Sequence, residues 1–504
     1  MKNILEMLEK STFEHGSKIV FADEFRSASY FDFSLNAKKI GSALANRELK
    51  GAVAVFINKS VACLEAMFGA LYGGCYYTVI DTKMPKERIS SLIEKIKPLA
   101  VLCSEDTFEE FSSFDFSLNL LVYENLVKEN IDEEKLNSIR NKQIDTDPAY
   151  VILTSGSTGK PKGTIVSHRS VLAYTHWLCS AFSIDENTVF GNQTPFYFSM
   201  SVSDVFATVR SGATLNIIPK KLFSFPVKLI EFLKERNVNT IYWVPSALCI
   251  VANWKTFSVA DAGFLKLIMF AGEVMPTKQL NYWVENVPNA KFANLFGPTE
   301  TTDICCYYVL NRKIPEDRSV PIGVHCDNCD CLIIDENGKA ADKGELYVRG
   351  SFVALGYVND SKKTSAAFVQ NPLNSNYPEI VYKTGDIVQL NEYGEMEYLS
   401  RADFQIKHMG YRIELGEIEF AANKIDGITL AVIVYDKEND RIVMVYQGKK
   451  KEESFIISEL KKYVPEYMMP TDIVRIKEMP YNANGKIDRK WIAQNYKNIN
   501  KKEG

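Results

Sequence analysis

The order of apolar and polar positions predicts a chain in which strands and helices alternate. Short apolar runs that suit buried strands lie at 52–56, 76–80, 100–102, 240–244, 265–270 and 291–295. Segments with apolar residues at helical spacing lie between them, at 61–72, 89–96, 227–236 and 276–284. This alternation is typical of parallel sheets covered by helices. It predicts an α/β fold for the larger part of the chain.

The pattern becomes rich in strands after about residue 320. Apolar runs at 331–334, 345–348, 380–382 and 397–399 flank two turn sequences, DENG at 335–338 and NEYG at 391–394, which suit hairpins. From about residue 402 a small α+β unit follows, with strands at 429–435 and 441–446 and a helix at 453–463. We therefore expect a large N-terminal domain of two helix-covered, mostly parallel sheets plus a β-rich subdomain, followed by a small α+β domain.

Composition and charge exclude several classes of protein. The 504 residues are 46% apolar and 24% charged, and their net charge of −4 argues against nucleic-acid binding. No apolar run reaches the ~18 residues of a membrane span. The first 18 residues are acidic in part and lack the apolar centre of a signal peptide, so they predict a surface helix. We expect a cytoplasmic protein with neither a membrane nor a nucleic-acid partner.

Ten cysteines are scattered along the chain, and most suit small buried thiols of a reducing compartment. One cluster, His325-Cys326-x-x-Cys329-x-Cys331, has spacing that also occurs in metal sites. However, Cys331 opens a strand-like run, and a second cysteine pair at a distance is not evident. The pattern favours structural thiols and leaves a metal site on these cysteines open.

The sequence TSGSTGKPKG at 154–163 lies between two short strand-like runs, 150–153 and 164–168. Its glycines allow tight or left-handed backbone that presents successive N–H groups to an anion. Hydroxyl and lysine side chains add donors and positive charge, so the loop suits a polyphosphate. The spacing differs from both the P-loop and the dinucleotide fingerprint. The candidate phosphate-binding residues are Thr154, Ser155, Gly156, Ser157, Thr158, Gly159 and Lys160.

This loop resembles the phosphate loop of the adenylate-forming superfamily, which includes acyl- and aryl-CoA synthetases, luciferases and the adenylation domains of nonribosomal peptide synthesis. Further motifs follow in the superfamily's order: NLFGPTETT at 294–302, YKTGD at 382–386, RADFQIKHMGYRIELGEIE at 401–419 and NANGKID at 482–488. The resemblance covers about 10–495. The segments QIKHMGYRIELGEIE and AGEVMP look most like stand-alone amino-acid adenylation enzymes such as D-alanine:carrier protein ligase.

The resemblance implies roles for individual residues, with ATP and Mg²⁺ as cofactors. Phe296 would stack on adenine, Asn294 would meet its amino edge, and Gly297 belongs to the same turn. Thr299 would hold phosphate and Glu300 would bind Mg²⁺, and both are candidate catalytic residues. Asp386 would accept hydrogen bonds from the ribose hydroxyls, with Arg401 as a second ribose or phosphate contact.

The resemblance also implies the domain boundaries. An adenylation core would span 1–400, a hinge at Asp403 would lie within 401–403, and a small mobile domain, 404–504, would carry the catalytic Lys486. A lysine ammonium that reaches the carboxylate and the α-phosphate would offset negative charge as the carboxylate attacks phosphorus.

The acid-binding pocket departs from the superfamily's pattern at one position. The motif FDxS, whose aspartate anchors an α-ammonium, here reads Phe198-Ser199-Met200-Ser201. A buried ammonium without a carboxylate partner is costly, so an ordinary α-amino acid is disfavoured. Asp303 could replace the anchor from another wall, or it could point to solvent or cap local backbone. The aligned pocket positions are Ser199, Met200, Ser203, Tyr242, Met269, Ala271, Leu295, Asp303 and Ile304.

We interpret the chain as an ATP-dependent ligase for a small carboxylic acid, favouring a β-amino or a hydroxyaryl or aryl acid. It would form an acyl-adenylate and transfer the acyl group to the phosphopantetheine thiol of a carrier protein. Residues 401–504 carry a net charge of +3 against −7 for the rest, which suits an acidic carrier. Two alternatives stay open: a ligase that uses free coenzyme A, and a non-catalytic regulator that binds adenylates.

Overall fold

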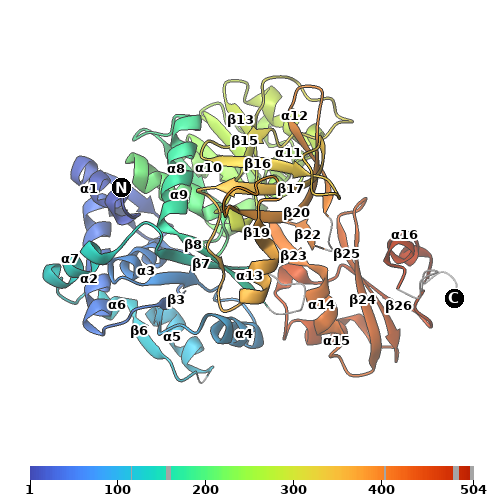
Figure 1. The fold of residues 1–504 in the computed structure, drawn as a ribbon, viewed down its shortest axis with the longest axis horizontal. Helices are drawn as coiled ribbons and strands as arrows, with labels where there is room; N and C mark the ends of the chain where they lie inside the picture. Colours follow the sequence, from blue (N-terminus) through green and yellow to red (C-terminus); the bar gives the residue numbers. More distant parts are fainter. Residues whose placement is uncertain (115, 155–160, 402–404, 481–486, 500–504) are drawn as a thin grey trace. The chain divides into compact units, whose positions relative to one another are not determined.

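The computed structural model describes the chain except for residues 115, 155–160, 402–404, 481–486 and 500–504 (Figure 1). It divides into two compact units. The first comprises Met1–Thr82, Ile96–Leu153 and Gly163–Ala402, and the second comprises Lys83–Lys95, Thr154–Lys162 and Asp403–Gly504.

A nine-stranded sheet is the largest sheet of the first unit. The six neighbouring strands from β13 to β1 run parallel, and antiparallel strands close both edges. In spatial order the strands are β15 (Val324–His325), β14 (Cys306–Val309), β13 (Lys291–Phe296), β12 (Leu267–Phe270), β11 (Thr240–Trp243), β9 (Val189–Asn192), β10 (Thr214–Ile217), β1 (Ile19–Ala22) and β2 (Ser27–Ser29).

A seven-stranded sheet lies in the same unit, and β4, β3, β5 and β6 run parallel within it. In spatial order its strands are β18 (Gly356–Tyr357), β8 (Lys162–Ser167), β7 (Pro148–Thr154), β4 (Tyr76–Val79), β3 (Ala52–Phe56), β5 (Ala100–Cys103) and β6 (Asn119–Val122). The helices of this half are α1 (Leu5–His15), α2 (Tyr30–Asn46), α3 (Val61–Tyr72), α5 (Glu105–Ser112), α6 (Tyr123–Leu126) and α7 (Glu133–Lys142).

Helix α9 (Met200–Ser211) is packed against both large sheets. It contacts β9 and β10 of the first sheet, and its Phe206 ring stacks on Tyr150 of β7 in the second. Phe206 also meets Phe68 of α3. All but the last two of its residues are buried, including the polar residues Ser203 and Asp204, because the helix contacts both sheets. The other helices of this half are α8 (His168–Phe182), α10 (Pro226–Glu235), α11 (Pro245–Asn253) and α12 (Thr277–Asn286), with 3₁₀ turns η1 (Lys220–Ser224) and η2 (Thr256–Ser258).

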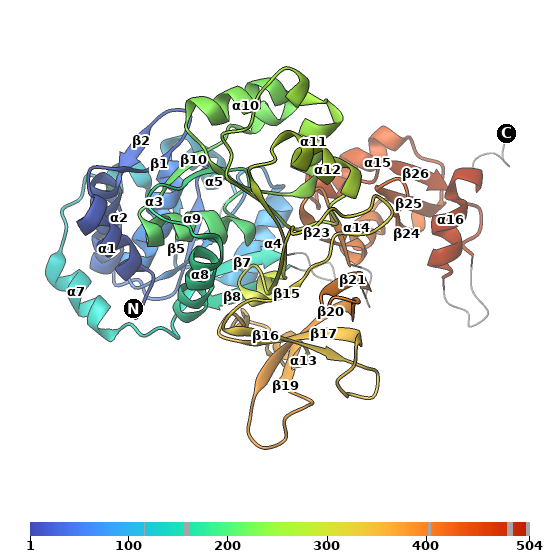
Figure 2. The same cartoon turned by 90° about the horizontal axis from the view of Figure 1, so that it is seen from above.

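An antiparallel five-stranded sheet completes the first unit, and Figure 2 shows its strands from above. It contains β16 (Cys329–Ile334), β17 (Lys343–Gly350), β19 (Phe368–Gln370), β20 (Ile380–Leu390) and β21 (Met396–Arg401), next to α13 (Ser361–Ala367). Both predicted turns are present. Gly338 and Gly394 adopt φ values of 76° and 73°, which glycine tolerates better than other residues.

The second unit contains a two-stranded and a three-stranded sheet. The strands are β22 (Gln405–His408), β23 (Tyr411–Glu414), β24 (Ile428–Asp436), β25 (Arg441–Gly448) and β26 (Asp472–Arg475). Side chains of β24 and β25 alternate between two apolar clusters, one shared with α14 (Leu415–Ala422) and α15 (Glu453–Leu460), the other with α16 (Arg489–Ile499). Helix α4 (Lys86–Ile96) and the 3₁₀ turn η4 (Glu466–Met468) complete the elements.

The predicted fold class is confirmed, and three local expectations need correction. The polar stretch after residue 104 holds α5, β6, α6 and α7, which its weak apolar pattern did not indicate. His168, expected to end a strand, instead begins α8, because the Ser167 hydroxyl caps the backbone N–H of Ser170. Helix α1 is not confined to the surface, since Leu5, Met7 and Leu8 are buried. Among the described residues, no helix is long and apolar enough to cross a bilayer.

The turn after β13 depends on the glycine at position 297. A Cβ atom there would lie 2.4 Å from Asp303 O, 2.5 Å from Ile304 Cα and 2.7 Å from Cys305 N. All three are backbone atoms, so we predict that Gly297→Ala lowers the free energy of unfolding by about 1–3 kcal/mol, as overpacking does. Urea unfolding measures the loss.

The matched control is Gly394→Ala, because a Cβ there meets nothing within 4 Å and only the positive φ opposes it. Its cost should stay near 1–2 kcal/mol, the usual penalty for a left-handed residue. Gly297→Ala should also displace the backbone of Asp303, whereas Gly394→Ala should not. A variant at position 297 that keeps full stability would contradict the steric argument.

Candidate active site

The end of β13 presents the first group of candidate residues. Phe296 closes the strand, and the chain then turns through Gly297 into the 3₁₀ turn η3 (Thr299–Thr301). Glu300 in this turn is fully buried, and its Oε1 accepts a hydrogen bond of 2.7 Å from the Tyr357 hydroxyl. A carboxylate at this depth needs such partners, because burial without hydrogen bonds is costly. The structure therefore holds Glu300 in one orientation.

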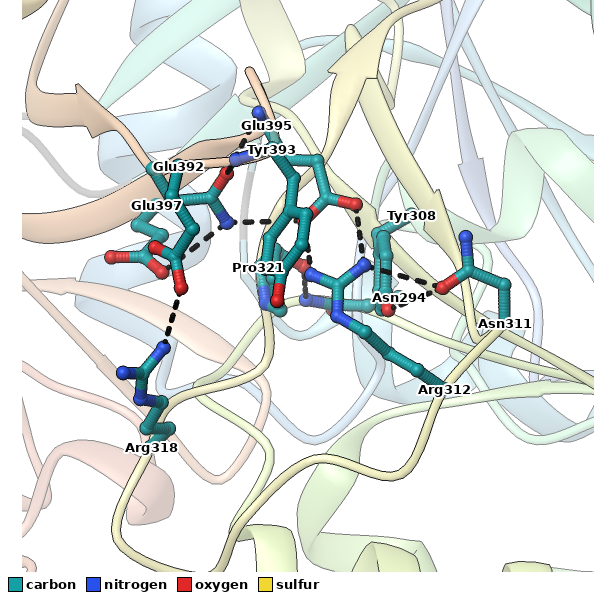
Figure 3. Close-up of polar contacts among 11 residues, drawn as sticks. Asn294, Tyr308, Asn311, Arg312, Arg318, Pro321, Glu392, Tyr393, Glu395 and Glu397 are labelled. Carbon is teal, nitrogen blue, oxygen red and sulfur yellow. Dashed lines mark hydrogen bonds and ion pairs between the residues drawn. The ribbon is translucent and has the colours of Figure 1, made fainter.

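Asn294 is fixed by the chain beside it. Its Nδ2 donates to the Pro321 carbonyl at 2.8 Å, so the amide oxygen is the acceptor that remains for another donor (Figure 3). Across the same region, Arg312 donates to Glu395 at 2.8 Å and stacks over the Tyr393 ring, 4.1 Å from its centroid. These contacts tie the segment after β14 to the turn between β20 and β21.

The five-stranded sheet contributes Asp386 and Arg401, which are paired neighbours on β20 and β21. Both side chains are nearly buried, and Arg401 donates to Asp386 Oδ1 at 2.8 Å and to the Thr384 carbonyl at 3.1 Å. Tyr398 of β21 places its ring 5.9 Å from that of Phe296. Hence the structure places Tyr398, which lies on the same strand as the candidate ribose contact Arg401, beside the candidate adenine contact Phe296.

Asp303 is buried at 1% exposure and does not point to solvent. Its Oδ2 accepts hydrogen bonds from Ser203 at 2.6 Å, Tyr242 at 3.0 Å and Tyr174 at 3.1 Å. Burial raises the pKa of Asp303 to about 6, and the hydroxyl donors, including Ser199, oppose that rise. Three elements, α8, α9 and β11, thus hold one carboxylate through neutral donors.

The other pocket candidates occupy the ends of neighbouring strands. Tyr242 and Met269 are register partners on β11 and β12, and Ala271 follows β12 directly. Ser199 accepts a hydrogen bond of 3.4 Å from Thr299, which joins the start of α9 to η3. The remaining candidates are buried as expected for an acyl pocket: Met200, Leu295 and Ile304.

Several candidates lie outside the described residues. These are the phosphate-loop residues Ser155, Gly156, Ser157, Thr158, Gly159 and Lys160, the hinge residue Asp403 and the catalytic candidate Lys486. Thr154 is described, at the end of β7, and its buried hydroxyl has no hydrogen-bond partner in the described part of the chain.

The sequence did not indicate three tyrosines that support the site. Tyr174, Tyr357 and Tyr398 contact Asp303, Glu300 and Phe296 from elements far away in the sequence. A buried tyrosine usually has a hydrogen-bond partner for its hydroxyl, so a tyrosine in the sequence is only a weak indication that such a partner exists. The identity of that partner follows only from the fold.

A second buried carboxylate, Asp204, follows Ser203 on α9. Its Oδ2 accepts from Asn192 Nδ2 at 2.6 Å, and the charge of Lys59 favours its ionised form. Burial raises the pKa of Asp204 and lowers that of Lys59, whose ammonium donates to the Gln193 carbonyl at 3.0 Å. No local sequence pattern indicates this group of Asp204, Asn192 and Lys59 either.

Two mostly parallel sheets with candidate residues at the ends of their strands, together with an antiparallel sheet, are the architecture expected of an adenylate-forming enzyme. Residues 8–358 match the family described as AMP-binding enzyme, and the chain belongs to this family. It is an AMP-forming ligase that uses ATP.

Two curated relatives span most of the chain. Zwittermicin A synthase ZmaJ of Bacillus cereus is 31% identical over 454 residues, 88% of this chain and 85% of the relative. A D-alanine--D-alanyl carrier protein ligase of Staphylococcus haemolyticus (strain JCSC1435) is 31% identical over 451 residues, 87% of this chain and 88% of the relative.

Among solved structures, the Vibrio cholerae adenylation domain AlmE, in complex with glycyl-adenosine-5'-phosphate, shares the fold. Its TM-score is 0.85 at 21% identity, and the match covers 99% of this chain and 98% of that one.

The raised pKa of Asp303 has a measurable consequence. Between about pH 4, where a free aspartate ionises, and about pH 6, the folded state binds a proton that the unfolded state does not. Stability therefore falls as the pH rises through this window. We predict that, as the pH rises through this window, the free energy of unfolding of the wild type falls relative to that of Asp303→Asn. Urea unfolding at each pH measures the difference.

Taking the difference between the two proteins removes the contributions of other titrating groups. Tyr174→Phe provides a second test, because it removes one donor to the ionised carboxylate and should extend the window to higher pH. The variant Tyr357→Phe, which loses a buried tyrosine hydroxyl elsewhere, is the control and should leave the window unchanged. A difference that does not depend on pH would contradict an ionisable Asp303 in the fold.

Proposed function

We propose that this ligase activates a carboxylic acid that carries an ammonium or hydroxyl group away from its α-carbon, as in a β-amino acid or a hydroxyaryl acid. We further propose that it transfers the acyl group to the phosphopantetheine thiol of a carrier protein. The observation that carries the first proposal is Asp303, a buried carboxylate whose donors are neutral hydroxyls.

Ser199 stands where related enzymes have the aspartate that anchors an α-ammonium. Its hydroxyl carries no charge, so an α-ammonium beside it would lose hydration without compensation. Ser203, Tyr242 and Tyr174 all donate to Oδ2 of Asp303, and these neutral hydroxyls leave the negative charge of the carboxylate without a counter-charge. A substrate whose ammonium binds Asp303 would therefore carry that ammonium away from its α-carbon, on the side of the site formed by β11 and α9.

The nucleotide would bind between the end of β13 and the hairpin of β20 and β21. Phe296, with Tyr398 nearby, supports a stacking site for adenine, and the amide oxygen of Asn294 can accept from its amino group. Asp386 uses Oδ1 for Arg401, so its other oxygen can accept from a ribose hydroxyl. The phosphates would lie against the loop that begins at Thr154, with Thr299 as an additional hydroxyl donor.

The buried carboxylate of Glu300 fits Mg²⁺, which prefers oxygen ligands, and the Tyr357 hydroxyl would orient it. Bound Mg²⁺ would supply positive charge to the phosphates. In the first half-reaction a carboxylate oxygen attacks the α-phosphorus, the acyl-adenylate forms and pyrophosphate leaves. Lys486 would hold the attacking carboxylate and offset charge on the α-phosphate.

In the second half-reaction the phosphopantetheine sulfur attacks the acyl carbon, the thioester forms, AMP leaves and the thiol proton is released. We propose that 404–504 moves as a domain about Asp403 between the two steps, since hinges need few residues. The net charge of +3 on residues 401–504 supports docking of an acidic carrier, and one relative is named as a carrier protein ligase. Equal turnover with free coenzyme A would contradict this acceptor.

Lys486 should be essential for adenylation. We predict that Lys486→Ala lowers ATP–pyrophosphate exchange by about 10²–10³, the effect of losing one preorganised charge contact. Lys490→Ala, which removes an exposed lysine from α16 of the same domain, is the matched control and should retain activity. If the two variants exchange pyrophosphate equally well, the assignment of Lys486 fails.

Substrate choice should depend on the pair Ser199 and Asp303. We predict that wild type prefers β-amino or hydroxyaryl acids over glycine and D-alanine in pyrophosphate exchange. A site that leaves a polar group unpaired can discriminate by roughly 10⁴–10⁵. Asp303→Asn should weaken a β-amino acid far more than a plain aryl acid, and Ser199→Asp should improve α-amino acids.

Three results separate the parts of this proposal. A wild-type preference for D-alanine or another α-amino acid would overturn the interpretation of Ser199. Loss confined to hydroxylated acids in Asp303→Asn would assign Asp303 to a hydroxyl instead of an ammonium. An unchanged substrate profile in Asp303→Asn would remove it from substrate binding altogether.

A further inference from the structure

Three cysteine sulfurs converge beside the candidate active site. Cys306 begins β14, Cys305 directly precedes it, and Cys331 lies on β16. The Sγ atoms of Cys306 and Cys331 are 3.2 Å apart, those of Cys305 and Cys306 are 3.9 Å apart, and all three lie within 4.8 Å of one another. Within the described part of the chain, this is the group of cysteine, histidine and acidic side chains that could hold a metal ion.

The cysteines that lie together differ from those that the sequence spacing suggested. The spacing of Cys326, Cys329 and Cys331 suggested a metal site within one segment, and no distant cysteine pair was evident. The structure instead brings the pair Cys305 and Cys306 to Cys331. Cys329 stays close, with its Sγ 3.8 Å from the Cys305 carbonyl oxygen.

The backbone holds these sulfurs in place. Cys306 is the register partner of Phe296 on one side and of His325 on the other. The Cys326 N–H donates to the Cys305 carbonyl at 3.0 Å, and the turn that follows contains Asn328 at φ 62° before β16 begins. Because strands and a tight turn position the three sulfurs, a ligand would find them already assembled.

The spacing and burial suit a thiophilic cation. A tetrahedral site with metal–sulfur bonds of about 2.3 Å places its sulfurs about 3.8 Å apart, close to the distances observed. Thiolates prefer Zn²⁺, Cu⁺ or iron–sulfur clusters. Zn²⁺ with three thiolates leaves a net charge of −1, whereas Cu⁺ would leave −2, and burial disfavours the larger charge. Cys305 and Cys306 are buried and Cys331 is half-buried, so an ion would enter at Cys331.

We propose that Cys305, Cys306 and Cys331 bind one Zn²⁺ ion between β14 and β16. Each cysteine thiol loses its proton to solvent as its metal–sulfur bond forms, and the fourth position is left to Cys329 or water. The ion would brace the segment that carries Asp303 and the strand that carries Phe296, because Cys305 N–H donates to the Phe296 carbonyl at 2.8 Å. The site lies outside the residues proposed for catalysis and does not depend on the identity of the acid.

The test measures metal binding directly. Protein purified under reducing conditions and incubated with Zn²⁺ is passed through a desalting column, and bound zinc per chain is measured by mass spectrometry. Co²⁺ is then used as a spectroscopic probe, because thiolate ligands give an intense near-ultraviolet band and tetrahedral geometry gives visible bands. We expect about one ion per wild-type chain with tetrahedral thiolate spectra.

Cys331→Ala and Cys306→Ala should each lower bound zinc at least tenfold and abolish the Co²⁺ thiolate band. Cys179→Ala, which removes a half-buried cysteine of α8 outside the cluster, is the matched control and should keep both signals. Circular dichroism confirms that each variant is folded.

A second measurement needs no variant. Zn²⁺ should slow alkylation of Cys331 at least tenfold relative to Cys179, and a chelator should reverse this protection. The proposal is overturned by wild type that retains less than a tenth of an equivalent of zinc, by equal zinc in wild type and Cys331→Ala, or by unprotected alkylation. A Cys306–Cys331 disulfide in protein isolated under reducing conditions would overturn it as well.

Discussion

The buried carboxylate of Asp303 is the constraint on which the surrounding packing depends. Removing an aspartate from water is unfavourable, so the surrounding elements must supply donors. Ser203, Tyr174 and Tyr242 do so from α9, α8 and β11, and every one of these hydroxyls is neutral. The position of α9 between the two large sheets is therefore fixed by apolar packing at Phe206 and by a polar network at Ser203.

The nucleotide region depends on a different connection. Arg312 joins the strand end near Asn294 to the hairpin of β20 and β21 through Glu395 and the Tyr393 ring (Figure 3). Backbone bonds between Gly323 and Met396 reinforce it. Because Asp386, Arg401 and Tyr398 all belong to that hairpin, the same connection sets their distance from Phe296. The candidate adenine and ribose contacts are thus positioned together by residues outside the candidate set.

The sequence predicted the elements whose formation depends on local patterns. Strands such as β3 and helices such as α3 match their apolar runs, and the turns at Gly338 and Gly394 match their turn residues. Long-range partners could not be predicted in the same way. Tyr174 and Tyr357 give no local signal of their carboxylate partners, and the pair Cys305 and Cys306 meets Cys331 only because β14 and β16 are placed side by side. These are consequences of topology, which one sequence does not specify pair by pair.

The contrast between the two buried carboxylates Asp204 and Asp303 supports the proposal that Asp303 binds a cationic substrate group. Asp204 has the ammonium of Lys59 to favour its charge, so that pair is neutral overall whether or not the proton is shared between them. Asp303 has no cationic partner among the residues that the structure describes; its donors are hydroxyls, which lower the cost of ionisation without cancelling the charge. Above about pH 6 Asp303 therefore carries a negative charge that burial penalises. A substrate ammonium would remove that penalty on binding, whereas an uncharged acid would leave it in place, and this difference favours an amino acid whose ammonium reaches Asp303.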